Sequence, residues 1–272
     1  MVSVAVIIPC YNAGRFLSEA LASIPESSDD ISIEIIVVDD GSNSADTLQA
    51  LQDIEKDARI KVIRQENRGV SSARNVGVRA SNSEFFLPLD ADDFIEARFI
   101  ELAVNEYSKN PRLGAVYSLA DKFSGEQFWP WELPKYDPKL ILFHNHIQNA
   151  CLFRKSDWTT VGGYDEEMIS GREDHDFLLK IIALGRQVSR IEEILFHYRQ
   201  HETSLNREIG SQRSEQIKVM QKIAMNNREL YGNNIDLVMQ QYMEEHFRLV
   251  DYQLRYSNLE RWRRRVRRIL RK

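Results

Sequence analysis

Two acidic residues, Asp90 and Asp92, follow a strand expected at residues 84–89 and are separated by one alanine. Carboxylates with this spacing can turn toward one site where a strand ends, and they are hard oxygen donors that suit Mg²⁺ or Mn²⁺. Such a cation also binds the oxygens of a diphosphate. The alternative is an acidic turn, and we interpret Asp93 as the cap of a helix that begins near Ala97.

Two further candidate residues follow other expected strands: Tyr11 after residues 4–8, and Asp39 after residues 34–38. Asp39 could accept a hydrogen bond from the imide N–H of a base or from a ribose hydroxyl, and Tyr11 could pack on a base ring. A turn acid and a core tyrosine are equally open alternatives. Because ligands bind beyond the carboxyl ends of parallel strands, both residues are placed where a ligand-binding edge is expected.

The first half of the sequence alternates between apolar runs and amphipathic segments. Continuous apolar, β-branched runs are typical of strands buried on both faces of a parallel sheet, with helices covering those faces. The predicted class is therefore α/β. We expect strands at residues 4–8, 34–38, 61–64 and 84–89, and helices at residues 13–24, 46–57, 71–80 and 97–108.

The second half is less regular and ends in a long helical pattern. From about Gly210 the sequence reads as helix, with a break near residues 231–234. We expect three regions: an α/β domain at residues 1–205, a helical appendage at 206–258 and a basic amphipathic tail at 259–272. The further elements expected in the α/β domain are strands at 115–120 and 150–154, a helix at 174–184 and an extended segment at 188–199.

Several common kinds of site and segment have no signature in the sequence. The glycine patterns of dinucleotide dehydrogenases, P-loop proteins and serine hydrolases are missing. Cys10 and Cys151 match no metal spacing and no disulfide framework, so we expect a reducing, cytoplasmic location. The apolar runs are far shorter than the ~20 residues that cross a bilayer. No basic segment precedes the first run, so we expect no signal peptide.

Seven segments, in order along residues 2–205, resemble the family 2 inverting glycosyltransferases of GT-A fold. Each segment alone is weakly specific, but the seven in order are highly specific. The resemblance implies a Rossmann-like, mostly parallel central sheet with flanking helices. The segments are VAVIIPCYN (4–12), IVVDDGS (36–42), NRGVSSARN (67–75), LPLDADD (87–93), GGYDE (162–166), GRED (171–174) and YRQH (198–201).

The resemblance implies that the first half binds a nucleotide diphosphate sugar, most often a UDP-sugar. Pro9, Tyr11 and Asp39 match positions that hold the uridine, while Gly69 and Arg74 match the loop near the base and ribose. A charge on a helix surface is the alternative for Arg74.

The resemblance also implies a divalent cation, Mn²⁺ or Mg²⁺, as cofactor. Asp90 matches the residue that faces the ribose and the metal, and Asp92 matches the metal ligand. His201 could ligate the metal through a neutral imidazole or contact the diphosphate, and a surface histidine is the alternative. Such a cation neutralises the charge that grows on a leaving diphosphate.

On the acceptor side, Asp174 matches the catalytic base of the family, which takes the proton of the attacking hydroxyl. We expect the N-terminus of its helix to stabilise Asp174 as an anion and keep it deprotonated. Glu173 would contact or orient the acceptor, although both residues could be simple first-turn acids. A single base favours one in-line displacement with inversion. The implied reaction is hexosyl or hexosaminyl transfer to a glycan or lipid-linked acceptor in polysaccharide biosynthesis.

Trp129 and Trp131 are weaker acceptor candidates, because aromatic faces suit the C–H faces of sugars; an aromatic mini-core is the alternative. Two other functions also stay open. A sugar-1-phosphate nucleotidyltransferase would need a glycine-rich, basic loop after the first strand, where residues 9–12 read Pro-Cys-Tyr-Asn. A non-catalytic sugar-nucleotide-binding module would be expected to lack Asp92 or Asp174.

Charge is distributed unevenly along the sequence. The net charge is −5, yet residues 261–272 hold eight basic residues and no acid. Without these eight, 28 basic residues face 41 acidic ones, which gives residues 1–260 a net charge of −13. Such a body should repel nucleic acid. We favour contact between the tail at 259–272 and an anionic membrane on the cytoplasmic side, with packing on an acidic protein surface or plain solvation as alternatives.

Overall fold

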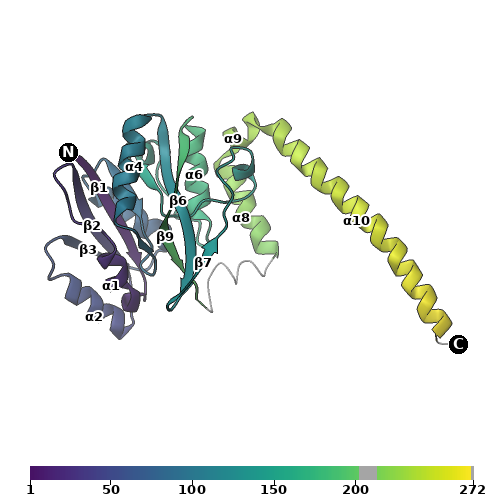
Figure 1. Ribbon diagram of the computed structural model, residues 1–272, viewed down its shortest axis with the longest axis horizontal. Helices are drawn as coiled ribbons and strands as arrows, with labels where there is room; N and C mark the ends of the chain where they lie inside the picture. The colour runs from purple at the N-terminus through teal and green to yellow at the C-terminus, as the bar shows by residue number, and fades with distance from the viewer. Residues whose placement is uncertain (202–212, 271–272) are drawn as a thin grey trace. The chain divides into compact units, whose positions relative to one another are not determined.

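The computed structural model describes residues 1–201 and 213–270 (Figure 1). The chain divides into two units, Met1–Asn227 and Arg228–Lys272. The expected domain boundary between residues 205 and 206 lies outside the described residues, as do the expected helical residues 210–212.

The first unit contains one nine-stranded mixed sheet, and the predicted α/β class is confirmed. The strands are β1 (Val2–Cys10), β2 (Ile31–Asp40), β3 (Ile60–Gln65), β4 (Phe85–Pro88), β5 (Phe94–Ile95), β6 (Leu113–Ser124), β7 (Gln127–Trp131), β8 (Leu152–Arg154) and β9 (Gln187–Arg199). Their order is β3-β2-β1-β4-β8-β6-β9-β5, with β7 paired to β6. The first four strands run parallel, whereas β8 is antiparallel to both β4 and β6.

Helices cover this sheet and connect its strands (Figure 1). They are α1 (Gly14–Ala22), α2 (Ala45–Ile54), α3 (Val70–Ala80), α4 (Arg98–Lys109), α5 (Lys155–Val161), α6 (Glu173–Ala183) and α8 (Arg213–Asn226), with a 3₁₀ turn, η1 (Leu140–Leu142). Helix α3 lies so close to β1 that a Cβ atom on Gly77 would fall 2.4 Å from Ile7 Cγ2. A glycine at this position therefore lets α3 approach the sheet, which fixes the place of the residues it carries.

Strand β1 forms the centre of the core. Residues 4–8 are fully buried, as expected for a parallel strand covered on both faces. All eight elements expected in the first half are present, with ends displaced by a few residues. The elements that the sequence analysis missed are β5, β7, η1 and α5, which are short and carry too few residues to show a clear hydrophobic period.

The second unit consists of α9 (Arg228–Asn233) and α10 (Ile235–Leu270). The break between them, at Asn234, lies within the predicted break at residues 231–234. Helix α10 continues without interruption across position 258, where the appendage was expected to give way to the tail. The tail side chains of Leu259, Ile269 and Leu270 lie outside the described residues. Among the helices that the structure describes, none has both the length and the apolar character needed to cross a bilayer.

Candidate functional site

The carboxyl ends of β1 and β2 lie at one edge of the sheet, because the two strands run parallel and in register. Asn12 joins the loops that follow, since its side-chain oxygen accepts the backbone N–H groups of Asn43 and Ser44 at 2.9 Å each. Asn12 has a φ of 52°, a conformation that asparagine tolerates better than most residues. Pro9 lies inside β1, while Tyr11 is 49% exposed at the edge. The ring of Tyr11 is thus accessible to a ligand.

Two buried aspartates end strand β2. Asp39 Oδ1 accepts the backbone N–H of Ser42 at 2.9 Å. Asp40 accepts the backbone N–H groups of Arg68 and Gly69, both at 2.8 Å, and so ties the loop before α3 to the sheet. Gly69 has a φ of 89°, which favours glycine. The sequence analysis gave Asp40 no role, although its place beside Asp39 in the IVVDDGS segment was a signal.

Arg74, on α3, bridges two carboxylates in the interior. Its side chain is 2% exposed, and its two terminal nitrogens lie 2.7 Å from Asp90 Oδ1 and 2.5 Å from Glu173 Oε1. Burial alone would lower the pKa of Arg74, but the charges of Asp90 and Glu173 outweigh it and raise the pKa well above its usual value. The alternative of a helix-surface charge is therefore wrong. The expected role of Arg74 beside the base and ribose stays a prediction.

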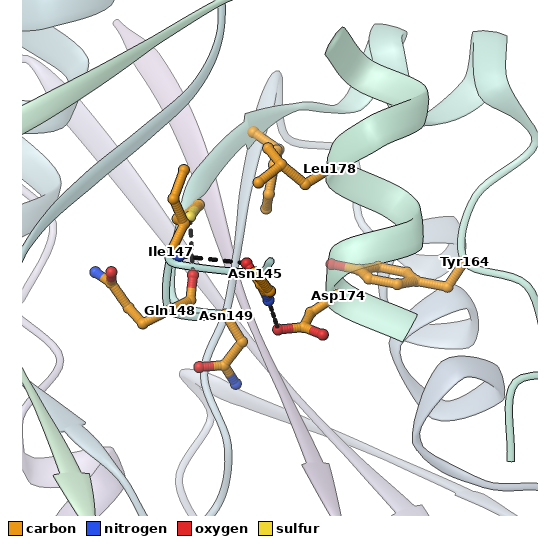
Figure 2. A pocket seen from close by; sticks show the side chains of 9 residues that line it. Asn145, Ile147, Gln148, Asn149, Tyr164, Asp174 and Leu178 are labelled. Carbon is orange, nitrogen blue, oxygen red and sulfur yellow. Dashed lines mark hydrogen bonds between the residues drawn. The ribbon is translucent and has the colours of Figure 1, made fainter. Parts of the chain in front are cut away.

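Two asparagines from the segment between η1 and β8 complete this network. Asn149 Nδ2 donates to Asp90 Oδ2 at 2.7 Å, and Asn145 Nδ2 donates to Asp174 Oδ2 at 2.8 Å. Figure 2 shows the amide of Asn145 pointing at Asp174, beside a cavity of about 10 Å³ that Tyr164 also lines. That volume is close to the room one water needs. The sequence analysis missed both asparagines, because no recognised motif contains them.

Asp174 is the second residue of α6 and is partly exposed, so its side chain is accessible from solvent. Its Oδ1 accepts the backbone N–H of His175 at 2.8 Å. Burial raises the pKa of Asp174 above its ordinary value; Arg74 and the His175 N–H act against this rise, and the charge of Asp90 adds to it. Burial thus opposes the expected stabilisation of the Asp174 anion by the helix N-terminus, and that this carboxyl stays deprotonated remains a prediction. Burial raises the pKa of Glu173 in the same way.

Asp92 and His201 form a second group of the site. Asp92 Oδ2 lies 2.7 Å from His201 Nε2, and the His201 ring packs on Phe16 with ring centroids 5.2 Å apart. Arg199 supports the pair from β9, since its Nε donates to the backbone oxygen of Asp92 at 2.7 Å. Burial raises the pKa of Asp92, and the nearby charge of Asp90 contributes.

Asp93 does not cap helix α4, so that interpretation was wrong. Its Oδ1 accepts the backbone N–H of Arg199 at 2.9 Å, whereas the N-cap position of α4, Ala97, makes no side-chain cap bond. Asp93 is buried, which together with neighbouring aspartates raises its pKa well above the usual range. The side chain therefore joins the loop after β4 to the end of β9, close to His201.

The three expected metal ligands are not gathered into one cluster. In the part of the chain that the structure describes, no group of three or more His, Cys, Asp or Glu side chains is placed to hold a metal ion. Both oxygens of Asp90 already accept hydrogen bonds, from Arg74 and Asn149. Asp92 and His201, which are in contact, do fit a divalent cation that takes its other ligands from diphosphate oxygens and water, as Mg²⁺ commonly does.

Trp129 and Trp131 lie in β7, which pairs antiparallel with β6. Trp131 packs on Tyr198 with ring centroids 5.1 Å apart, and the Lys122 ammonium lies 4.7 Å from its ring centroid. Trp129 is 38% exposed. The stretch thus contains one packed and one accessible tryptophan, and contact of either with an acceptor stays a prediction.

Comparison with known proteins gives the family context of this site. Residues 5–161 match the sequence model described as Glycosyl transferase family 2. The chain is 28% identical over 228 residues to a chondroitin synthase of Escherichia coli, covering 80% of this chain and 32% of that protein. It is 28% identical over 254 residues to an uncharacterized glycosyltransferase of Haemophilus influenzae, covering 86% of this chain and 76% of that protein.

Among solved structures, S. aureus TarS 1–349 shares the fold. Its complex with UDP-GlcNAc has a TM-score of 0.65 and 20% identity, covering 83% of this chain and 66% of that chain. Its complex with UDP has a TM-score of 0.64 and 21% identity, covering 83% and 65%. The chain thus spans about a third of the chondroitin synthase and just under two thirds of these TarS chains.

Replacing Arg74 tests how much the site depends on its bridge. Arg74→Met leaves Asp90 and Glu173 without their buried counter-charge, so we expect the free energy of unfolding of the first unit to fall by about 3–5 kcal/mol at neutral pH. Urea denaturation measures this change. Arg79→Met is the matched control on α3: its ion pair with Glu166 is exposed, so the expected loss is below about 1 kcal/mol.

The deficit of Arg74→Met should grow as the pH rises. Without Arg74 the folded-state pKa of Glu173 moves further above its unfolded value. A carboxyl whose pKa is raised in the folded state makes the fold less stable as the pH rises above the unfolded-state pKa of that carboxyl. Equal deficits at about pH 5 and about pH 8 would show that the bridge is not what stabilises these groups.

Proposed function

Because the chain belongs to glycosyl transferase family 2, we propose that it transfers a hexosyl or hexosaminyl group from a UDP-sugar to a hydroxyl of a glycan or lipid-linked acceptor. The observation that carries this proposal is the Arg74 bridge. It joins Asp90, on the expected donor side, to Glu173, which directly precedes Asp174 on the acceptor side. A relative named chondroitin synthase, and TarS chains bound to UDP and UDP-GlcNAc, support this substrate class.

In this proposal the uridine lies at the edge formed by β1 and β2. The exposed ring of Tyr11 stacks on the base. Asp39 Oδ1 accepts the Ser42 N–H, so its second carboxylate oxygen can accept a hydrogen bond from a base N–H or a ribose hydroxyl. A Cβ on Gly69 would meet nothing within 4 Å, so open space at this position lets the nucleoside approach the backbone.

Asp174 is the proposed general base. Its raised pKa makes the carboxylate a stronger proton acceptor, and bonds from Asn145 and the His175 N–H fix its orientation. The acceptor hydroxyl gives its proton to Asp174 as its oxygen attacks the anomeric carbon. The bond to the diphosphate breaks on the opposite face, and its electron pair leaves with the diphosphate. A single displacement therefore inverts the anomeric centre.

A divalent cation, Mn²⁺ or Mg²⁺, is the proposed cofactor, held by Asp92 and His201 with Asp90 beside them. When bound, it supplies positive charge that offsets the charge on the departing diphosphate. Arg199 keeps the two ligands in place, since it holds the backbone of Asp92 and lies two residues before His201.

Neutralising the proposed base should remove transfer but not donor binding. We expect Asp174→Asn to lower kcat by about 10²–10⁴-fold, because the amide cannot take the acceptor proton, while UDP affinity changes little. The wild-type rate should fall as the pH drops through a value above 3.8, the ordinary pKa of an aspartate. The rate of UDP release from a panel of UDP-sugars measures the effect on transfer, and calorimetry measures the affinity for UDP.

Glu101→Gln is the control, because Glu101 is an exposed first-turn acid of another helix, α4, and should leave the rate unchanged. Normal transfer by Asp174→Asn would show that the base is assigned wrongly. Wild-type binding of UDP-sugars with no UDP release would favour the non-catalytic module. Formation of pyrophosphate or of a sugar nucleotide would favour the nucleotidyltransferase.

The metal assignment is tested by removing the Asp92 carboxylate. We expect Asp92→Ala to weaken UDP binding in the presence of Mn²⁺ by about tenfold or more, because a ligand to the cation is lost. In EDTA, wild type and Asp92→Ala should bind UDP equally weakly. If EDTA changes neither the UDP affinity nor the transfer rate of the wild-type chain, the metal proposal is contradicted and the transferase proposal still holds.

Membrane contact through residues 259–272 stays a prediction. The eight basic residues of 261–272 should attract anionic lipid. We expect the full chain to float with vesicles containing phosphatidylglycerol, and a chain that ends at residue 258 to stay behind. Equal flotation of the two chains would remove the idea.

A further inference from the structure

Helix α10 exposes an unusual number of large apolar side chains. Ten of the twenty large hydrophobic residues that are exposed in the described chain lie on it. Exposed apolar surface on this scale marks a surface that binds something. The order of these residues along the helix indicates what that partner is.

Nine of the seventeen apolar residues of α10 fall on a seven-residue repeat, with steps of three and four residues in alternation, while the exposed Met239, Met243, Phe247, Leu254 and Trp262 lie outside it. The repeat covers eleven positions, and Glu245 and Arg263 are the charged ones among them. We call this set the seam. Its members are Ile235, Val238, Tyr242, Glu245, Leu249, Tyr252, Tyr256, Leu259, Arg263, Val266 and Leu270. Such a repeat, sustained over five heptads, is the pattern of a helix that pairs with another helix.

A flat surface fits the seam poorly. A seven-residue repeat drifts by about 20° per heptad around a straight helix, so over five heptads the drift approaches about 100°. A membrane plane therefore cannot meet all of the seam, whereas a second helix follows it by supercoiling. The rings of Tyr252 and Tyr256, 4.2 Å apart, lie together on this face. Five seam side chains are 51–62% exposed: Ile235, Tyr242, Leu249, Tyr252 and Tyr256.

The two charged seam positions decide the direction of the partner helix. Glu245 lies nine residues before Leu254, and Arg263 lies nine residues after it. In an antiparallel pair with its two-fold axis at Leu254, Glu245 faces Arg263 of the partner subunit, and the reverse holds by symmetry. The remaining facing pairs are apolar or aromatic throughout: 252 with 256, 249 with 259, 242 with 266, and 238 with 270.

A parallel pair would instead bring like charges together. Glu245 would face Glu245 of the partner subunit, and the arginine-rich ends at 261–268 would lie side by side. Like charges at facing positions are a recognised means of rejecting the wrong alignment. In the antiparallel pair the two arginine-rich ends lie apart, and each lies beside residues 240–247 of the other helix, which contain no Lys or Arg. Charge complementarity thus favours the antiparallel arrangement.

We propose that the chain forms a homodimer in which two α10 helices pair as an antiparallel coiled coil along the seam, with Glu245 facing Arg263 of the partner subunit. The proposal is independent of the sugar-transfer activity, because no residue of the site takes part in it.

A charge-swap experiment on the full chain tests this proposal. Sedimentation equilibrium without lipid should show that the wild-type chain is a dimer. Glu245→Arg and Arg263→Glu should each weaken dimerisation by about tenfold or more, because each creates two like-charge contacts per dimer. The double variant Glu245→Arg/Arg263→Glu should return the dissociation constant to within about threefold of wild type, because it restores both opposite-charge pairs.

Matched controls change the same charges outside the seam. Glu244 lies next to the seam residue Glu245, and Arg261 lies two residues before the seam residue Arg263. Neither is a seam residue, so Glu244→Arg and Arg261→Glu should leave the dimer intact. Circular dichroism should show equal helix content in every variant, since the substituted side chains are exposed.

Three results would overturn the proposal. A wild-type chain that is monomeric at every protein concentration has no such dimer. A double variant as weak as the single variants would mean that Glu245 and Arg263 do not face each other. A monomeric chain that binds phosphatidylglycerol vesicles through the seam, and loses this binding in Leu249→Glu, would make lipid the occupant of the apolar face.

Discussion

One buried ion bridge, centred on Arg74, decides how the site of the first unit is built. Its guanidinium holds Asp90, just past β4, and Glu173, the first residue of α6, although the two acids are far apart in the sequence. A buried charge is costly unless it is paired, so each partner requires the others. The next residue of α3, Asn75, donates to the backbone oxygen of Tyr164 and accepts the N–H of the same residue. Helix α3 thus positions the segments that carry Asp90, Tyr164 and Glu173.

This arrangement keeps several acids close together and partly out of water. Burial raises the pKa of Asp92, Glu173 and Asp174, and proteins concentrate such perturbed groups at functional sites. Each of three carboxylates has a neighbouring side chain in contact: Asn149 donates to Asp90, Asn145 donates to Asp174, and the His201 ring lies against Asp92. These contacts fix where each carboxylate points, which a base or a metal ligand requires.

Sequence patterns predicted the strands and helices that carry the site, because long apolar runs such as residues 4–8 and 34–38 show their period clearly. Local motifs singled out Asp39 and Asp90 as candidates, and the resemblance to the family singled out Asp174. They did not predict what these residues contact. Asn145 and Asn149 lie in a loop without a motif, and Asp93 was interpreted as a cap because its partner, Arg199, is more than a hundred residues away. The pKa of Asp174 depends on burial, which a helix N-terminus in a sequence does not reveal.

The central claim is that the nucleotide binds at the sheet edge formed by β1 and β2, and that Arg74 holds the segments that carry Asp90 and Asp174 beside that edge. A crystal structure of the chain with UDP and Mn²⁺, with anomalous scattering used to locate the metal, tests it most directly. The account predicts a metal peak beside Asp92 and His201, uracil against Tyr11, and an Arg74 that still contacts Asp90 and Glu173. Nucleotide bound away from the edge formed by β1 and β2, or an Arg74 released from both acids, would contradict it.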